Sequence, residues 1–272
     1  MHNQALDKRW HQDNSPPRKQ AIRLIEDAIR NKYANLSRAA FSRIFDQAWN
    51  RGMKAPDESA LAGQLRIADG AEADVANQVI LLLLIDRFWA PDAALARPLQ
   101  TIHSMLFGLN GANDFRTEIE VKDFDDELRT KVEEVRIRLD EIESLAWTFT
   151  SYLRNAGMEI QAMFLAHVFA SAIRIHPFPD GNGRTARLFV QYALRCWRLP
   201  FLPIPKVRND LGWKQALATA IDGDAGPLAE QFQVRMMAGF GHGATVGGGP
   251  DERVANISVI NPDSWKKERA AG

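Results

Sequence analysis

The stretch from His176 to Arg187, HPFPDGNGRTAR, combines side chains that could bind a phosphate group with one that could move a proton. It interrupts two apolar segments of helical periodicity with four turn-forming residues in a row, Asp180 to Gly183. Histidine is the side chain best suited to exchange a proton near neutral pH, and arginine pairs well with phosphate oxygens. These residue types suit phosphate chemistry better than a plain connection between helices.

The expected phosphate site lies where the loop meets the next helical segment. The first N–H groups of a helix have no internal partner and carry the positive end of its dipole, and such a helix start binds anions. The glycines Gly181 and Gly183 would let a ligand approach the backbone closely. Arg184 and Arg187 are three residues apart and share a helix face, so two guanidinium groups would complete an anion site.

The other three side chains of the stretch have separate expected roles. Mg²⁺ typically takes one or two carboxylates together with phosphate oxygens and water, so Asp180 is the expected metal ligand. His176 is the expected general base, and Phe178 could anchor the loop to the core. Positioning and charge stabilisation of this kind suit phosphoryl or nucleotidyl transfer. Taken singly, each residue also fits a structural role, and His176 could be a histidine that favours a helix C-terminus.

No other phosphate or metal motif occurs in the sequence. The pattern G-x-x-x-x-G-K-[ST], a kinase glycine-rich loop and H-E-x-x-H are all absent. The remaining histidines show no ligand spacing.

The elements that would position the stretch are mostly helical. Apolar residues recur at helical spacing in several segments, namely 21–45, 74–90, 126–153, 155–175, 188–199 and 210–237. The segment 101–115 is expected to be a short helix that runs into the loop GLNGAND. Asp57 or Ser59 could cap the helix that follows residue 58. One segment, RTEIEVKDF, alternates Ile119 and Val121 with charged residues and predicts a strand. We therefore predict a mainly α fold with one short β element.

Composition excludes several classes of protein. The 272 residues include 34 basic and 34 acidic side chains, so no global basic field would hold nucleic acid. Cys196 is the single cysteine, which fits a reducing compartment. The longest purely apolar run, Val79 to Ile85, is far shorter than the roughly 20 residues of a membrane span, and the first residues do not resemble a secretory signal. We expect a cytoplasmic protein that does not enter a membrane.

At every defined position HPFPDGNGRTAR resembles the signature of Fic-domain proteins, H-x-F-x-[DE]-G-N-G-R-x-x-R. The resemblance extends from about Pro98 to Met236, because TIHSMLFGLNGANDFRTEIEV and WKQALATAIDGDAGPLAEQF are similar to flanking parts of that family. It implies a Fic-type helical bundle with a short β-hairpin flap over the active site. The expected division of the chain is a polar arm at 1–20, an accessory helical region at 21–97, the Fic domain at 98–236, and a glycine-rich linker and tail at 237–272.

The resemblance also implies a reaction and its residues. The reaction is the Mg²⁺-dependent transfer of AMP from ATP to a Ser, Thr or Tyr hydroxyl of a target protein. The implied roles are general base for His176, metal ligand for Asp180, anion hole for Gly181, Asn182 and Gly183, β- and γ-phosphate binding for Arg184 and Arg187, loop anchor for Phe178, and target docking at the flap for Glu118, Ile119, Glu120 and Val121. Gly183 favours AMP transfer, because the family branch that transfers the γ-phosphate has lysine there.

Alternatives to this reaction remain open. The donor could be another nucleotide or phosphate-containing compound, the reaction could remove AMP, or the protein could bind a nucleotide without catalysis. Many family members carry an inhibitory helix with the pattern [ST]-x-x-x-E-[GN], and the nearest stretch here, TKVEEV at 130–135, departs from it. We therefore expect no self-inhibition of that kind, and any inhibitor would be a separate antitoxin-like protein.

Overall fold

The computed structural model describes residues 16–29, 32–66, 70–89, 95–108, 115–117, 130–199, 201–202, 204 and 210–239. The elements in these ranges are helices, without a strand, so the prediction of a mainly α protein is confirmed for this part of the chain. The predicted flap residues Glu118, Ile119, Glu120 and Val121 lie outside the described residues, as do residues 1–15 and 240–272.

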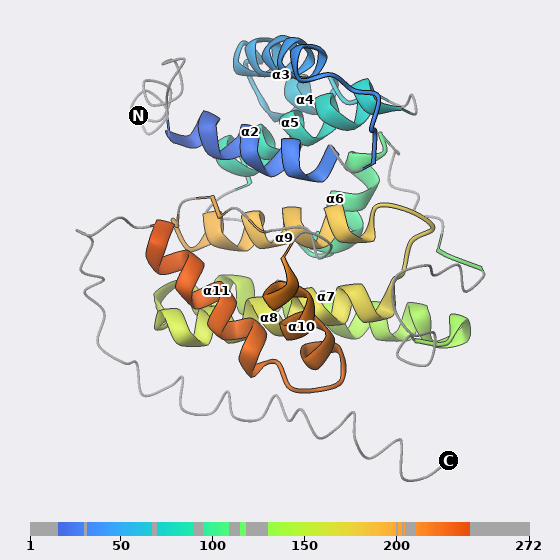
Figure 1. The fold of residues 1–272 in the computed structure, drawn as a ribbon, viewed down its shortest axis with the longest axis vertical. Helices are drawn as coiled ribbons and strands as arrows, with labels where there is room; N and C mark the ends of the chain where they lie inside the picture. The colour runs from blue at the N-terminus through green and yellow to red at the C-terminus, as the bar shows by residue number, and fades with distance from the viewer. Residues whose placement is uncertain are drawn as a thin grey trace.

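The N-terminal helices form the upper part of the molecule in Figure 1. They are α2 (Pro16–Ile29), α3 (Arg38–Met53), α4 (Glu58–Ala62) and α5 (Ala71–Arg87). Helix α2 begins within the stretch 1–20 that we expected as a polar arm, because proline is well tolerated in a first helical turn. Asp57 caps α4 by accepting the Ala60 N–H at 2.8 Å, which confirms one of the two predicted caps.

The remaining helices surround the central helix α8 (Met158–Ile175). They are α6 (Pro98–Leu106), α7 (Val135–Tyr152), α9 (Asn182–Cys196), α10 (Leu211–Ile221) and α11 (Gly226–Gly239), with short 3-10 turns η2 (Val132–Glu134) and η3 (Leu153–Asn155). Among the helices described, α8 is long and apolar enough to cross a membrane, and 61% of it is buried within the protein. Helices α7, α9, α10 and α11 pack against it, and this packing accounts for its apolar composition.

Helix α5 is joined to α9, which crosses the middle of Figure 1. Asp74 in the first turn of α5 forms an ion pair with Arg184, and Asp86 near its end pairs with Arg195 at 2.5 Å. Almost every residue of α5 from Ala73 onward is buried, and one hydrophobic core includes side chains of both helices. The region 21–97 therefore packs as part of the same body as the loop-bearing helices.

A buried carboxylate from α7 holds the start of α6. Glu143, 2% exposed, accepts the N–H groups of Leu99 at 3.1 Å and Gln100 at 2.7 Å. Burial raises the pKa of the Glu143 carboxyl to about 7, although the two N–H groups favour its ionised form. The position of α6 matters for the loop, because its His103 contacts Phe178.

The raised pKa of Glu143 predicts that its contribution to stability depends on pH. The folded-state pKa of Glu143 is raised, so its contribution is fully present below the unfolded pKa of about 4.5 and is lost as the pH rises through about 7. Between pH 5 and 8, the free energy of unfolding of the wild type should fall by about 2–3 kcal/mol relative to Glu143→Gln, which cannot titrate. Urea denaturation of both proteins at each pH measures this difference. A difference that stays constant with pH would contradict the assignment.

Candidate active site

His176 ends helix α8 in a backbone conformation that histidine rarely adopts. Its φ and ψ of 46° and 57° lie in the left-handed region, and its N–H donates to the Ala172 carbonyl at 3.1 Å. Glycine usually occupies such a position, and another residue there costs about 1–2 kcal/mol. The structural reading of His176 as a helix-end residue is thus correct, but a strained non-glycine residue also points to a functional need for its side chain.

Arg116 fixes the backbone around His176. Its Nε donates to the His176 carbonyl at 2.7 Å, and its Nη2 donates to the carbonyls of Ile175, at 3.2 Å, and Thr130. The Arg116 N–H also donates to the Pro177 carbonyl at 3.0 Å. The buried guanidinium thus satisfies the last carbonyls of α8, where it also complements the negative end of the helix dipole.

Phe178 and Asn182 fasten the middle of the loop. Asn182 accepts the Phe178 N–H through Oδ1 at 3.0 Å and donates to the Phe178 carbonyl through Nδ2 at 2.6 Å. The buried Phe178 ring stacks on His103 of α6, with 3.6 Å between ring centroids, and His103 Nε2 donates to the Asp180 carbonyl at 3.0 Å. The Asn182 side chain therefore shapes the loop, and only its backbone N–H remains at the start of α9.

Helix α9 starts inside the stretch of interest, at Asn182. Its first helical hydrogen bond runs from the Thr185 N–H to the Gly181 carbonyl at 2.8 Å, so the N–H groups of Asn182, Gly183 and Arg184 have no carbonyl of the helix to bind. The Gly181 N–H donates instead to Asp180 Oδ1 at 2.6 Å. Of the three predicted anion-hole residues, Asn182 and Gly183 thus present their N–H groups at the helix start, whereas Gly181 uses its own within the loop.

The backbone conformation at Gly181 requires glycine, whereas Gly183 has room for a side chain. Alanine should therefore affect stability differently at the two positions. Gly181 has φ of +82°, and a Cβ there would stand 2.5 Å from Cε2 of Phe107. Gly181→Ala should therefore lower the free energy of unfolding by about 2–3 kcal/mol. At Gly183 the nearest atom to a Cβ is Nη1 of Arg187 at an ordinary 3.7 Å, so Gly183→Ala should be neutral or raise stability by up to about 1 kcal/mol. Urea denaturation compares the two variants, and equal losses would contradict this reading.

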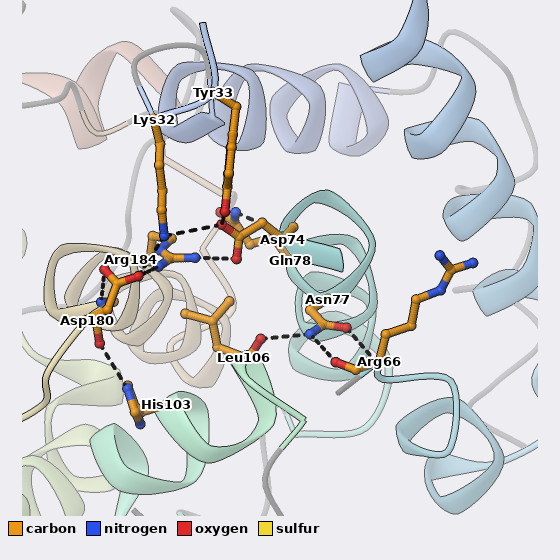
Figure 2. A network of polar contacts seen from close by, with 11 residues as sticks. Lys32, Tyr33, Arg66, Asp74, Asn77, Gln78, His103, Leu106, Asp180 and Arg184 are labelled. Carbon is orange, nitrogen blue, oxygen red and sulfur yellow. Dashed lines mark hydrogen bonds and ion pairs between the residues drawn. The ribbon is translucent and has the colours of Figure 1, made fainter. Parts of the chain in front are cut away.

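Four charged side chains meet beside the helix start, as Figure 2 shows. Arg184, 6% exposed, forms an ion pair with Asp74 of α5 and donates to Asp180 Oδ2 at 2.8 Å. Its guanidinium carbon lies 5.0 Å from the centre of the Phe107 ring. Lys32, which follows α2, places Nζ 2.6 Å from the same Asp180 oxygen. The first arginine of the motif is thus buried among groups of its own chain.

Asp180 is ionised and accessible, as a metal ligand must be. Burial alone would raise the pKa of its carboxyl, but Arg184, Lys32 and the Gly181 N–H outweigh burial and lower the pKa to about 2. Its side chain is 59% exposed. In the part of the chain that the structure describes, no group of three or more His, Cys, Asp or Glu side chains could hold a metal ion. A cation at Asp180 would take its other ligands from phosphate and water, and this ligand set fits Mg²⁺.

The second arginine of the motif, Arg187, has different surroundings. It is half-buried, and its Nη1 lies 3.7 Å from the point where a Cβ on Gly183 would stand. Its side chain thus lies back along α9 toward the N-terminus of the helix. Arg184 is held against Asp74, whereas Arg187 lies over the helix start.

Several residues of the site were not identified from the sequence. Asp74 accepts the Tyr33 hydroxyl at 2.5 Å as well as Arg184. Burial, followed by that hydrogen bond, raises the pKa of Tyr33, so its hydroxyl stays protonated. One turn further along α5, Asn77 donates to the Leu106 carbonyl at the end of α6 at 2.8 Å (Figure 2). An acid and an amide on one face of an apolar helix were the only available sequence signal.

The fold and the loop together define a helical domain in which a short loop with charged side chains joins the two central helices α8 and α9. Residues 96–194 match the sequence model of the Fic/DOC family. This match confirms, for that segment, the resemblance noted from the sequence. Proteins with this domain are generally transferases.

The chain was also compared with solved structures and with curated proteins. Among solved structures, the chain is similar to the crystal structure of a Fic family protein from Desulfovibrio desulfuricans G20, with 18% identity and a TM-score of 0.46. That alignment covers 94% of this chain and 91% of the other. No curated protein matches the chain.

Proposed function

We propose that the protein is an adenylyltransferase that transfers AMP from ATP to a Ser, Thr or Tyr hydroxyl of a target protein. His176 accepts the proton of that hydroxyl. The hydroxyl oxygen forms a bond to the α-phosphorus, and the bond from the α-phosphorus to the oxygen that bridges to the β-phosphate breaks. Pyrophosphate leaves with that electron pair, and Arg184, Arg187 and the start of α9 stabilise its charge.

The observation that carries this proposal is the shortness of the loop. Only the segment from His176 to Gly181 separates the end of α8 from the start of α9. One strained histidine and one ionised carboxylate, Asp180, thus lie next to a free helix N-terminus, within a loop whose backbone is fastened by side chains from α6 and by Arg116. These groups are thereby held in fixed relative positions, as a transferase requires, and this supports the roles of base, metal ligand and anion site proposed for them.

Three further features complete the proposal. Bound by Asp180, Mg²⁺ would neutralise phosphate charge and polarise the phosphorus–oxygen bonds. The segment Glu118, Ile119, Glu120 and Val121 docks the target as an added strand, which is a main-chain mode of recognition. The reaction takes place in the cytoplasm, and any restraint comes from a separate inhibitory protein.

Labelled ATP tests the proposed reaction. The full-length protein is incubated with Mg²⁺, a cell lysate as target pool, and ATP that carries ³²P at either the α- or the γ-phosphate. Label from the α-position alone should appear on protein, and EDTA should prevent it. Label from the γ-position alone would replace the proposal with a kinase reaction. Absence of both labels, in a sample that binds ATP by calorimetry, would favour a non-catalytic nucleotide-binding protein.

A further inference from the structure

The expected metal ligand, Asp180, already has a donor on each oxygen. Lys32 Nζ lies 2.6 Å and Arg184 Nη2 lies 2.8 Å from Oδ2, and the Gly181 N–H donates to Oδ1 at 2.6 Å. Lys32 reaches the cluster from above in Figure 2, from the segment that follows α2, whereas Arg184 belongs to α9. A metal ion bound to the remaining lone pair of Oδ1 would stand close to the two cations at Oδ2, and these like charges would repel one another.

The two cations are held with very different strength. Arg184 is 6% exposed, is paired with Asp74 and lies over the Phe107 ring, and displacing it would leave buried charges without partners. The Lys32 side chain is 36% exposed, and its second carboxylate contact, Asp74 Oδ2, is at 3.6 Å. An ammonium group is a point charge on a flexible stem, and exposed ion pairs of this kind contribute little to stability. Lys32 is therefore the partner that can leave Asp180.

The charges of the cluster indicate where Lys32 would go. Two carboxylates, Asp74 and Asp180, face two cations, Arg184 and Lys32. A nucleoside triphosphate stays negative after it binds Mg²⁺, so an ammonium group that is no longer paired with Asp180 would be attracted to its phosphate oxygens. An ammonium group displaced from Asp180 would stay near it on its four-carbon stem and would be able to contact the phosphate groups of a nucleotide bound there.

We propose that Lys32 is a substrate-binding residue that exchanges partners. It holds Asp180 when no nucleotide is bound, and it binds the terminal phosphates of a nucleoside di- or triphosphate once Asp180 takes up the metal. This proposal rests on the proposed function for its substrate. It assigns a direct role in the site to the region N-terminal of the Fic/DOC match at 96–194.

Calorimetric titration with two nucleotides tests the phosphate contact. The ligands are AMP and a triphosphate analogue with a methylene bridge between the α- and β-phosphorus, both with Mg²⁺. Lys32→Ala should weaken binding of the analogue about 5- to 30-fold and change AMP binding less than about 2-fold. For Lys32→Arg, which keeps the charge, the affinity for the analogue should lie between those of the wild type and Lys32→Ala. Lys19→Ala, which removes an exposed lysine from α2, should match the wild type.

A second titration uses Mn²⁺ without nucleotide, followed by electron paramagnetic resonance. Lys32→Ala should bind this ion about 2- to 5-fold more tightly than the wild type, because no ammonium group competes for Asp180.

Each outcome of these titrations bears on a named part of the proposal. Equal weakening of AMP and analogue would show that Lys32 acts only by shaping the loop, and unchanged binding of the analogue would remove its role. Unchanged or weaker Mn²⁺ binding would contradict the exchange at Asp180. If the wild type bound neither nucleotide, the proposed function and this inference would fail together. If the wild type binds the nucleotides and only Lys32→Ala loses affinity for the analogue, the proposed function stands.

Discussion

Replacing His176 by alanine should lower the rate of AMP transfer by about 10²–10⁴-fold, the usual contribution of a general base. Affinity for ATP should change little, because the proposed phosphate site is at the start of α9 whereas His176 lies at the end of α8. The rate is measured with α-labelled ATP and the affinity by calorimetry. His167→Ala, which removes a histidine from the same helix, is the matched control and should keep the wild-type rate per folded molecule.

A second comparison at this position separates chemistry from backbone strain. His176→Gly and His176→Ala both lose the imidazole, but only glycine tolerates φ of 46° without a penalty. The glycine variant should therefore be about 1–2 kcal/mol more stable than the alanine variant, and equally inactive. A similar loss of ATP affinity and transfer rate in both variants would mean that His176 holds the nucleotide and is not the base.

Removing Asp74 should have the largest effect on stability. Asp74→Ala leaves the buried Arg184 without its α5 partner and the Tyr33 hydroxyl without its acceptor. Breaking a buried ion pair on one side costs about 3–5 kcal/mol, so the midpoint of urea denaturation should fall accordingly. Asp74→Asn keeps an acceptor for Tyr33 but not the charge, so its midpoint of urea denaturation should lie between those of Asp74→Ala and the wild type.

Glu72 provides the matched control for Asp74. It lies in the same first turn of α5, but its side chain is exposed and its contact with Arg43 is at 4.0 Å. Glu72→Ala should change the free energy of unfolding by less than about 1 kcal/mol. If the two alanine variants were equally stable, the pair between Asp74 and Arg184 would contribute nothing to the fold.

The helices and the loop could be predicted because their signals are local. Apolar periodicity located α5, α8 and α9, and Asp57 was identified as a helix cap from its position alone. The start of α9 was expected after the glycines, but Asn182 already belongs to the helix, because its side chain bonds Phe178 rather than the helix start. A turn dipeptide does not reveal which way such a side chain will point.

The partners of the motif could not be predicted, since they depend on tertiary structure. The sequence predicted that Arg184 and Arg187 would complete an anion site, but in the structure Arg184 is paired with Asp74, 110 residues away. Nothing in one sequence links these two positions. His103 and Arg116 were likewise not identified from the sequence. Only the fold brings His103 against the Phe178 ring and Arg116 to the His176 carbonyl. Contacts of this kind follow from packing and not from local propensity.

The attachment of α5 at three points has a practical consequence for how the protein can be divided. Its Asp74, Asn77 and Asp86 reach Arg184, the Leu106 carbonyl and Arg195. The first two of these partners lie within residues 96–194, and Arg195 is the first residue beyond them. A fragment excised at the borders of that match would keep the whole motif and lose Asp74, the buried partner of Arg184. The smallest autonomous transferase in this chain should accordingly include α5, and any attempt to graft the loop onto another scaffold would have to carry that helix with it.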